Sequence, residues 1–145
     1  MTRCGKLRRF LVDSRGAVAI EFAAIAVPLM LLLGGSIELS RYMWTRHALQ
    51  DSASTGARCL GLQVEPCFSG ETMDRPATLD FVRQQAASWL ITIAEDTVTT
   101  DAVSDCHGVA DFARVGIRSR FASVLVVFSG IWIEVEACFP VMPSD

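Results

Sequence analysis

The feature that most constrains this chain is a run of 21 residues, 17–37, in which Glu21 is the only charged side chain. About 20 apolar residues in a helix are enough to cross the hydrocarbon core of a bilayer. The run is longer than the apolar region of a cleaved secretory signal peptide, and the helical pattern continues beyond Gly34 and Gly35. We therefore predict one transmembrane helix that stays in the protein.

Basic residues are concentrated before this run. Residues 1–16 contain five Lys or Arg and one acidic residue, whereas the rest of the chain contains eight basic and 15 acidic residues. The positive-inside rule then places the N-terminus in the cytoplasm and the C-terminal part outside the membrane. The acidic composition of the chain after residue 16 also argues against nucleic acid as a partner, because binding phosphates requires a basic surface.

Glu21 is unusual because a carboxylate in an apolar span costs about 2.5–3.5 kcal/mol near the bilayer centre, and less near an edge. One interpretation is that Glu21 lies near the cytoplasmic edge and reaches the headgroups. The other depends on spacing, since a cut between Gly16 and Ala17 would make Glu21 the fifth residue of the mature chain. It could then pair with the new N-terminal ammonium of its own chain or of a neighbour, which would set the register of packed helices.

The residues around this position resemble a type III signal peptide of the kind that prepilin peptidases cut. A basic leader ends in Gly16, and Glu21 and Phe22 follow Ala17 at the expected distance. Residues 14–60 are similar to the N-terminal region of TadE-like proteins, minor pseudopilins of the tight-adherence (Flp) pilus system. The features that carry this wider resemblance are Glu21-Phe22, Pro28, Gly34, Ile37-Glu38 with Arg41, and Gly56-Ala57-Arg58.

The resemblance implies that Gly16 is required for cleavage before Ala17 and that Glu21 and Phe22 act in subunit assembly. Ala17 departs from the methylated Phe of many type IV pilins, so N-methylation is left open. The implied partners are a prepilin peptidase, other pilins and pseudopilins, the pilus assembly platform and the lipid bilayer. The implied function is biogenesis of pili used for surface adhesion, and TadE and TadF are not distinguished.

The resemblance also implies a location, the bacterial inner membrane, with a single pass and a periplasmic C-terminal domain. Whether the protein stays there or enters the extracellular fibre is left open. One alternative is a pseudopilin of a type II secretion or competence system, which shares the leader. Another is a signal-anchored exported enzyme or binding domain, although the chain has no GxSxG motif and no lysine after Lys6. We expect no enzyme activity and no cofactor.

The predicted fold is α+β and pilin-like, with a leader (1–16), a transmembrane helix (17–37), its continuation outside the membrane (38–60) and a small extracytoplasmic domain (61–145). Within that domain we expect a loop over 61–76, a second helix over 77–91, and a short antiparallel sheet from strands 97–103, 113–121 and 131–138.

The apolar run 124–128 is expected to pack in the core. The apolar stripe of the first helix comprises Leu39, Tyr42, Leu49, Ala53, Gly56 and Leu60, interrupted by Arg46. In the second helix the near-helical apolar positions are Leu79, Val82, Ala86, Trp89 and Leu90.

Alternation along the last strand places Glu134 and Glu136 on one face, and alternation along its expected partner does the same for Arg118 and Arg120. We predict cross-strand ion pairs between these side chains. A catalytic carboxylate pair is disfavoured because no His or nucleophile is patterned beside it. Tyr42 and Trp44 follow the span and are equally compatible with an interfacial aromatic belt and with an ordinary helix face.

Removal of the leader would delete Cys4 and leave Cys59, Cys67, Cys106 and Cys138. An even number of cysteines outside the membrane indicates disulfides, with three connectivities available. We favour Cys59 with Cys67, which would pin the helix end to its loop, and Cys106 with Cys138. A zinc site at Cys106 and His107 is disfavoured because the chain has neither a CxxC nor a HxxxH pair, so we expect no metal.

Overall fold

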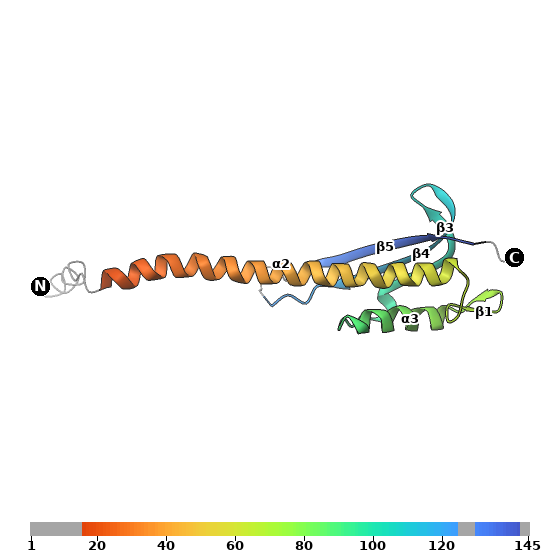
Figure 1. The fold of residues 1–145 in the computed structure, drawn as a ribbon, viewed down its shortest axis with the longest axis horizontal. Helices are drawn as coiled ribbons and strands as arrows, with labels where there is room; N and C mark the ends of the chain where they lie inside the picture. The colour runs from red at the N-terminus through yellow and green to blue at the C-terminus, as the bar shows by residue number, and fades with distance from the viewer. Residues whose placement is uncertain (1–15, 125–129, 143–145) are drawn as a thin grey trace, which may run out of the picture. The chain divides into compact units, whose positions relative to one another are not determined.

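The computed structural model describes residues 16–124 and 130–142. The chain divides into two compact units, Met1–Leu39 and Ser40–Asp145, and the boundary falls within the longest helix. The predicted α+β class is confirmed by the helices and antiparallel strands of Figure 1. The elements in chain order are α2 (Ala17–Gly61), β1 (Phe68–Ser69), β2 (Thr72–Met73), α3 (Arg75–Ser88), η2 (Glu95–Thr97), β3 (Val98–Cys106), β4 (Val109–Arg120) and β5 (Trp132–Pro140).

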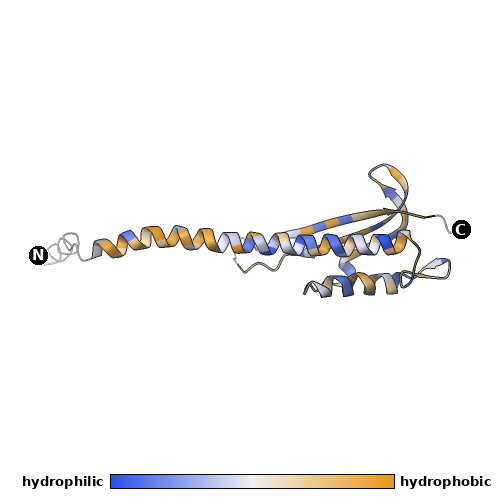
Figure 2. Cartoon of the chain, viewed as in Figure 1, coloured by the Kyte–Doolittle hydropathy of each residue, from blue (hydrophilic) through white to orange (hydrophobic). Residues whose placement is uncertain are grey.

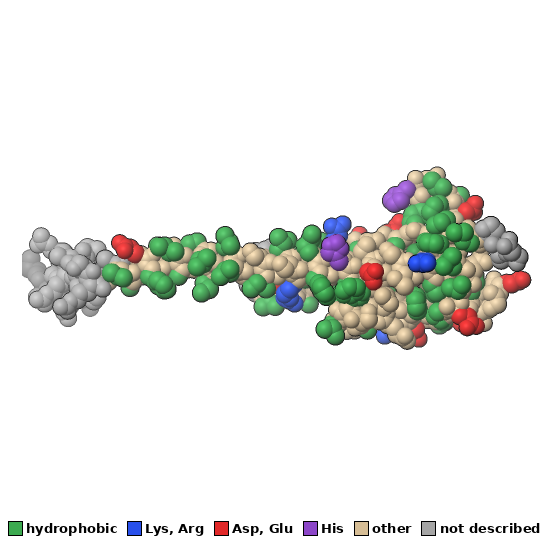
Figure 3. All heavy atoms as spheres, viewed as in Figure 1, with side chains coloured by type: hydrophobic (Ala, Val, Ile, Leu, Met, Phe, Trp, Pro, Cys, Tyr) green, Lys and Arg blue, Asp and Glu red, His purple; other side chains and the backbone are tan. Residues whose placement is uncertain are grey.

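The described part of the first unit is the N-terminal portion of α2, a mainly apolar segment (Figure 2) whose charged residues are Glu21 and Glu38. Its large hydrophobic side chains, such as Val18, Phe22 and Leu31, are largely exposed, and Figure 3 shows hydrophobic side chains along this part of the helix. Pro28 lies inside the helix without ending it, as membrane helices tolerate. A helix that is apolar on every side requires lipid or packed neighbours, and this one is long and apolar enough to fit a single-pass membrane anchor.

In the second unit, α2 buries one stripe and exposes the other side. Leu49, Ala53 and Leu60 are fully buried in the core, whereas Gln50 and Ser54 are exposed. Most of the predicted stripe is confirmed, since Gly56 is also buried and Tyr42 packs against the core. The exception is Leu39, the last residue of the first unit, which is 63% exposed.

Helix α3 begins two residues earlier and ends three residues earlier than predicted. It begins at Arg75 because the Asp74 side chain accepts a hydrogen bond from the Ala77 amide at 3.0 Å, which satisfies a free N–H of the first turn. It ends at Ser88 because Leu90 adopts a positive φ of 62°. The prediction that Leu90 shares the apolar face is wrong, since this side chain is 95% exposed.

The three-stranded sheet has the order β3-β4-β5, with both pairings antiparallel. The β3–β4 connection is a two-residue turn in which His107 and Gly108 have φ values of 53° and 84°, as a tight hairpin requires. The strands are longer than predicted at the ends that join this hairpin. The predicted loop 61–76 also contains a second, two-stranded sheet, β1-β2, that the sequence pattern did not indicate.

The core lies where α2, α3 and the inner face of the sheet meet. Inward-facing side chains include Val82 of α3, Val115 and Ile117 of β4, and Ile133 of β5. Of the apolar segment 124–128, only Val124 is described; it is 75% exposed, against expectation, and the other four residues lie outside the described ones.

Gly56 sets how closely α2 approaches its neighbours. A Cβ atom there would lie 2.6 Å from Val82 Cγ2 of α3 and 3.5 Å from Val115 Cγ2 of β4. Both neighbours are β-branched and buried, so they have little freedom to move away. The glycine is therefore required by a three-way contact between α2, α3 and the sheet.

We expect Gly56→Val to lower the free energy of unfolding by roughly 1–3 kcal/mol, because it overpacks this contact. The measurement is denaturant unfolding of the full chain in detergent, followed by near-ultraviolet circular dichroism. Ser54→Ala is the control, since it lies on the exposed side of the same helix. Equal stability of the two variants would contradict the packing described for Gly56.

Candidate functional site

The predicted processing position coincides with the start of α2, which begins at Ala17 directly after Gly16. Gly16 is exposed, and a Cβ atom at this position would meet no atom within 4 Å. Its φ does not lie in the left-handed region, since no positive value is found there. The described fold therefore gives no internal reason for a glycine at position 16, and a requirement for it would come from an external binding partner.

Glu21 lies one turn into α2 and is exposed, as is Phe22 beside it. Its helical neighbours Val18 and Ile25, three residues before and four after, are exposed apolar side chains. Among the residues that the structure describes, none forms a hydrogen bond or ion pair with the Glu21 carboxylate. The carboxylate is thus a single charge on an apolar helix surface, where an unpaired charge is costly once water is removed.

The four cysteines after residue 16 form two disulfides, Cys59 with Cys67 and Cys106 with Cys138. The first joins the last turn of α2 to the residue before β1, over a Cα–Cα distance of 5.9 Å. The second joins the end of β3 to β5 over 6.4 Å. Because β3 and β5 each pair only with β4, the second bond links the two outer strands across the central one.

The outer face of the sheet carries an ion-pair network. Arg118 lies opposite Glu134 in the register and contacts it at 2.9 Å. Arg114 donates to Asp101 at 2.8 Å and lies 3.9 Å from Glu136. The hydrogen bond to Asp101 raises the pKa of the Arg114 guanidinium, which therefore stays charged. Exposed pairs of this kind contribute little to stability, because water and salt screen the charges.

The predicted use of Arg120 in these pairs is wrong. The register places Arg120 opposite Trp132 rather than opposite a glutamate. Both Arg120 and Arg118 lie over the Trp132 ring, at 4.9 and 4.7 Å from its centroid. Trp132 therefore occupies the end of the network, and cation–π contact replaces the expected ion pair there.

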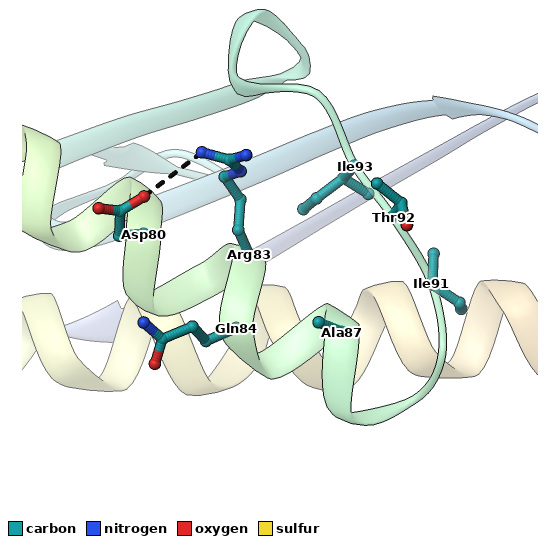
Figure 4. Close-up of a pocket in the computed structure, with 7 residues that line it drawn as sticks. All are labelled: Asp80, Arg83, Gln84, Ala87, Ile91, Thr92 and Ile93. Atoms are coloured by element: carbon teal, nitrogen blue, oxygen red, sulfur yellow. Dashed lines mark hydrogen bonds and ion pairs between the residues drawn. The ribbon is translucent and has the colours of Figure 1, made fainter.

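Three shallow hollows lie on the second unit. The one in Figure 4 has a volume of about 280 Å³ and contains the Asp80–Arg83 pair at 3.3 Å. Another, of about 410 Å³, lies over the outer sheet face beside Gly116 and the arginine-paired Glu134. The third, of about 520 Å³, is lined by Arg75, Leu79, Glu95 and Asp96. No His, Cys or Ser lines any of these three hollows.

One group of side chains has the composition of a metal site. The ligand atoms of Cys106, Glu136 and Cys138 lie within 4.8 Å of one another. The two sulfur atoms are bonded to each other, however, and a disulfide does not supply the thiolate that a metal requires. His107 occupies the adjacent hairpin turn. Cys106 is therefore unavailable as a thiolate ligand while this bond is intact.

An aromatic cluster that the sequence analysis missed joins α2 to the end of α3. Trp44 and Trp89 form an edge-to-face pair with ring centroids 5.4 Å apart. The Trp89 Nε1 donates to Asp51 Oδ2 at 3.2 Å, and Gln85 Nε2 donates to the same oxygen at 3.3 Å. The seven-residue spacing of Trp44 and Asp51, two helical turns on one face, was the available signal.

Tyr42, which the sequence analysis treated together with Trp44, has a different environment. It is half-buried and forms an edge-to-face contact with Phe121, with centroids 5.6 Å apart. Trp44 is 58% exposed. Tyr42 therefore belongs to the core periphery, and only Trp44 faces outward.

Comparison with known proteins gives one match. Residues 16–58 match the model of the family described as TadE-like protein. No curated protein and no solved structure matches the chain. The matched segment begins at the predicted cleavage position and ends in the last turn of α2.

We expect the two disulfides to differ in reactivity in the folded protein. Cys67 is fully buried and Cys59 is nearly so, whereas Cys138 is partly exposed, and thiol exchange requires access to a sulfur atom. Under limiting reductant, alkylation followed by peptide mapping should label Cys106 and Cys138 before Cys59 and Cys67. In denaturant this order should disappear. Earlier labelling of Cys59 and Cys67 in the native protein would contradict the burial described here.

Proposed function

We propose, from the match of residues 16–58 to the TadE-like family model, that this chain is a TadE-like minor pseudopilin of the Tad pilus system, cut by a prepilin peptidase after Gly16. The cut chain is anchored in the inner membrane by the N-terminal part of α2. Its N-terminal side faces the cytoplasm and Ser40–Asp145 faces the periplasm. It acts in assembly of tight-adherence pili rather than as an enzyme.

The observation that carries this proposal is the exposed apolar surface of α2 with a single carboxylate in it. The large side chains of this segment, from Val18 to Ile37, are largely exposed, so the described fold does not bury them. Lipid and neighbouring helices are the two environments that cover such a surface. In a pilus subunit, lipid covers this surface while the subunit is in the membrane, and neighbouring parallel helices cover it once the subunit is in the fibre.

Cleavage would change the electrostatics of the helix start. A cut after Gly16 creates an ammonium at Ala17, where the positive end of the helix dipole disfavours a cation. Glu21 is four residues further along, hence on the same face and about 6 Å along the axis. Its carboxylate can pair with this ammonium or with that of an adjacent subunit. The second pairing fixes the axial position of one helix relative to the next.

The family match favours the tight-adherence system over type II secretion or competence systems, whose pseudopilins carry the same kind of leader. The proposed partners are the prepilin peptidase, other pilins and pseudopilins, the assembly platform and the bilayer.

The two disulfides stabilise a small domain in an oxidising compartment. The loop-closure entropy predicts that they raise the free energy of unfolding by about 2.5 kcal/mol for the 8-residue separation and about 3.7 kcal/mol for the 32-residue separation.

N-terminal sequencing of the membrane-extracted protein tests the processing. With an active prepilin peptidase the mature chain should begin at Ala17, and without the enzyme it should keep the leader. Gly16→Leu should accumulate as precursor without loss of fold, because no atom lies near the added side chain. Gly34→Ala, which also meets no atom within 4 Å, should be cut normally. A chain that still begins at Met1 with active enzyme would refute the proposal.

Glu21→Gln tests the assembly role. If the ion pair contributes at least about 1.4 kcal/mol per subunit contact, incorporation into sheared pili should fall about tenfold, while cleavage stays largely intact. Incorporation is measured by quantitative immunoblotting of the sheared fraction. Glu71→Gln is the matched control, since it removes an exposed carboxylate from the β1–β2 turn. Loss of cleavage in Glu21→Gln would show that the carboxylate acts in processing instead.

A further inference from the structure

We name Met43, Trp44, Trp89 and Leu90, four apolar side chains of the second unit, the tryptophan patch; three of them are exposed and Trp89 is half-buried. Two come from α2 and two from the residues directly after α3. Met43 is 46% exposed, Trp44 58% and Leu90 95%. The Trp44–Trp89 ring contact brings the two segments together. The patch is thus assembled by the tertiary fold from residues 45 positions apart in sequence.

The patch is held in place by polar contacts. Asp51 accepts hydrogen bonds from Trp89 Nε1 and from Gln85, which fixes the end of α3 against α2. The Leu90 amide donates to the Ala87 carbonyl at 2.9 Å, and the Ile91 amide donates to the Ala86 carbonyl at 3.1 Å. These bonds hold the chain reversal that follows α3 in a defined conformation.

Leu90 is the most informative member. Its φ of 62° lies in the left-handed region that glycine occupies without strain after a helix. A leucine there strains the backbone, and its side chain is almost completely exposed to water. The hydrogen bonds of the Leu90 and Ile91 amides hold this backbone conformation, but the Leu90 side chain stays 95% exposed. Its side chain is therefore suited to bind something outside the chain.

The position of the patch in the sequence indicates a membrane. Trp44 is only seven residues beyond Ile37, the last residue of the apolar run. That stretch spans about 10 Å as a helix and at most about 25 Å if extended. Helical side chains also point back toward the N-terminus of the helix. Along the continuous helix α2, Trp44 therefore lies about 10 Å beyond the apolar run, close to the headgroup region.

Charge around the patch fits an anionic surface. Arg41 and Arg46 lie on either side of Trp44 in the sequence, and the nearest acidic residues are Glu38 before them and Asp51, which accepts a hydrogen bond from Trp89, after them. Arginine side chains next to aromatic rings can reach lipid phosphates while the rings lie among the headgroups. A second copy of this acidic domain would instead bring mainly like charge.

We propose that the tryptophan patch docks on the anionic bilayer surface beside the membrane-spanning segment, with Leu90 and the two indole rings at the boundary between headgroups and acyl chains. This inference rests on the membrane anchorage in the proposed function. The contact gives Ser40–Asp145 a second attachment to the membrane besides the chain itself. Extraction of the subunit from the bilayer breaks this attachment.

Tryptophan fluorescence tests the proposal directly, because the chain contains three tryptophans, and Trp132 serves as an internal control. Trp132 is 44% exposed and lies on the outer sheet face, away from the patch residues in sequence and on a different element. Three full-chain variants each keep one tryptophan and replace the other two with Phe. They are placed in nanodiscs of phosphatidylcholine and phosphatidylglycerol with brominated acyl chains.

Quenching of Trp89 and of Trp44 should be about twofold greater than quenching of Trp132, as interfacial insertion requires. Replacing phosphatidylglycerol with phosphatidylcholine, or raising the salt concentration, should reduce the difference. Leu90→Gly relieves the backbone strain, so it should fold at least as well and yet lower the quenching of Trp89. Equal quenching of Trp89 and Trp132 would overturn the proposal.

Two further readouts separate the alternatives. Quenching that appears only when two or more copies share a nanodisc would identify a second copy as the occupant and would overturn docking on lipid. Resistance of the same protein to carbonate extraction shows that the anchor is intact. Processing and pilus incorporation are measured separately in cells, so failure of the proposed function and failure of the docking contact give different results.

Discussion

The close contact of α2 with both α3 and β4 at Gly56 is the interaction on which the second unit depends. This close contact allows the buried stripe of α2, with Leu49, Ala53 and Leu60, to pack at the centre of the core. The sheet packs one face on this stripe, and α3 packs beside it through Val82. Without the close approach, a domain of this size would lose the shared burial that stabilises each element.

The same helix has a different physical role on the other side of Leu39. There its apolar side chains are not used by the described fold, and Glu21 is the only charged residue in the run 17–37. A surface of this kind is stable only when lipid or another helix covers it. In the proposed function, the location of Glu21 one turn after the cut links proteolysis to assembly, since cleavage creates the cation that the carboxylate can pair with.

The predicted elements that agree with the structure are those fixed by local pattern. The period of the α2 stripe located its buried side, and alternation in β4 and β5 located their inner faces, because side chains that share a face recur at fixed spacings. Of the three connectivities that the four cysteines allow, the favoured one is found in the structure. The Arg118–Glu134 pair was predictable from the alternation in β4 and β5, but Arg120 was misassigned because alternation does not define the register between strands.

Leu90 and Trp89 show where local pattern fails. Both fit the apolar period of α3, yet the helix has already ended when the chain reaches them, and Leu90 points into solvent. The pairing of Trp89 with Trp44 and Asp51 depends on how α3 packs on α2, which no segment of the sequence encodes by itself. The exposed patch could therefore not be derived before the fold was known.

The sequence by itself determined the apolar run, its basic flank, the single carboxylate and the residues that carry the family resemblance, because each depends on composition or spacing within one continuous segment. Only the tertiary structure decided the strand register, the environment of each aromatic side chain and the need for glycine at position 56. These depend on distances between segments far apart in the chain. Such distances are set by packing of the whole core rather than by local preference.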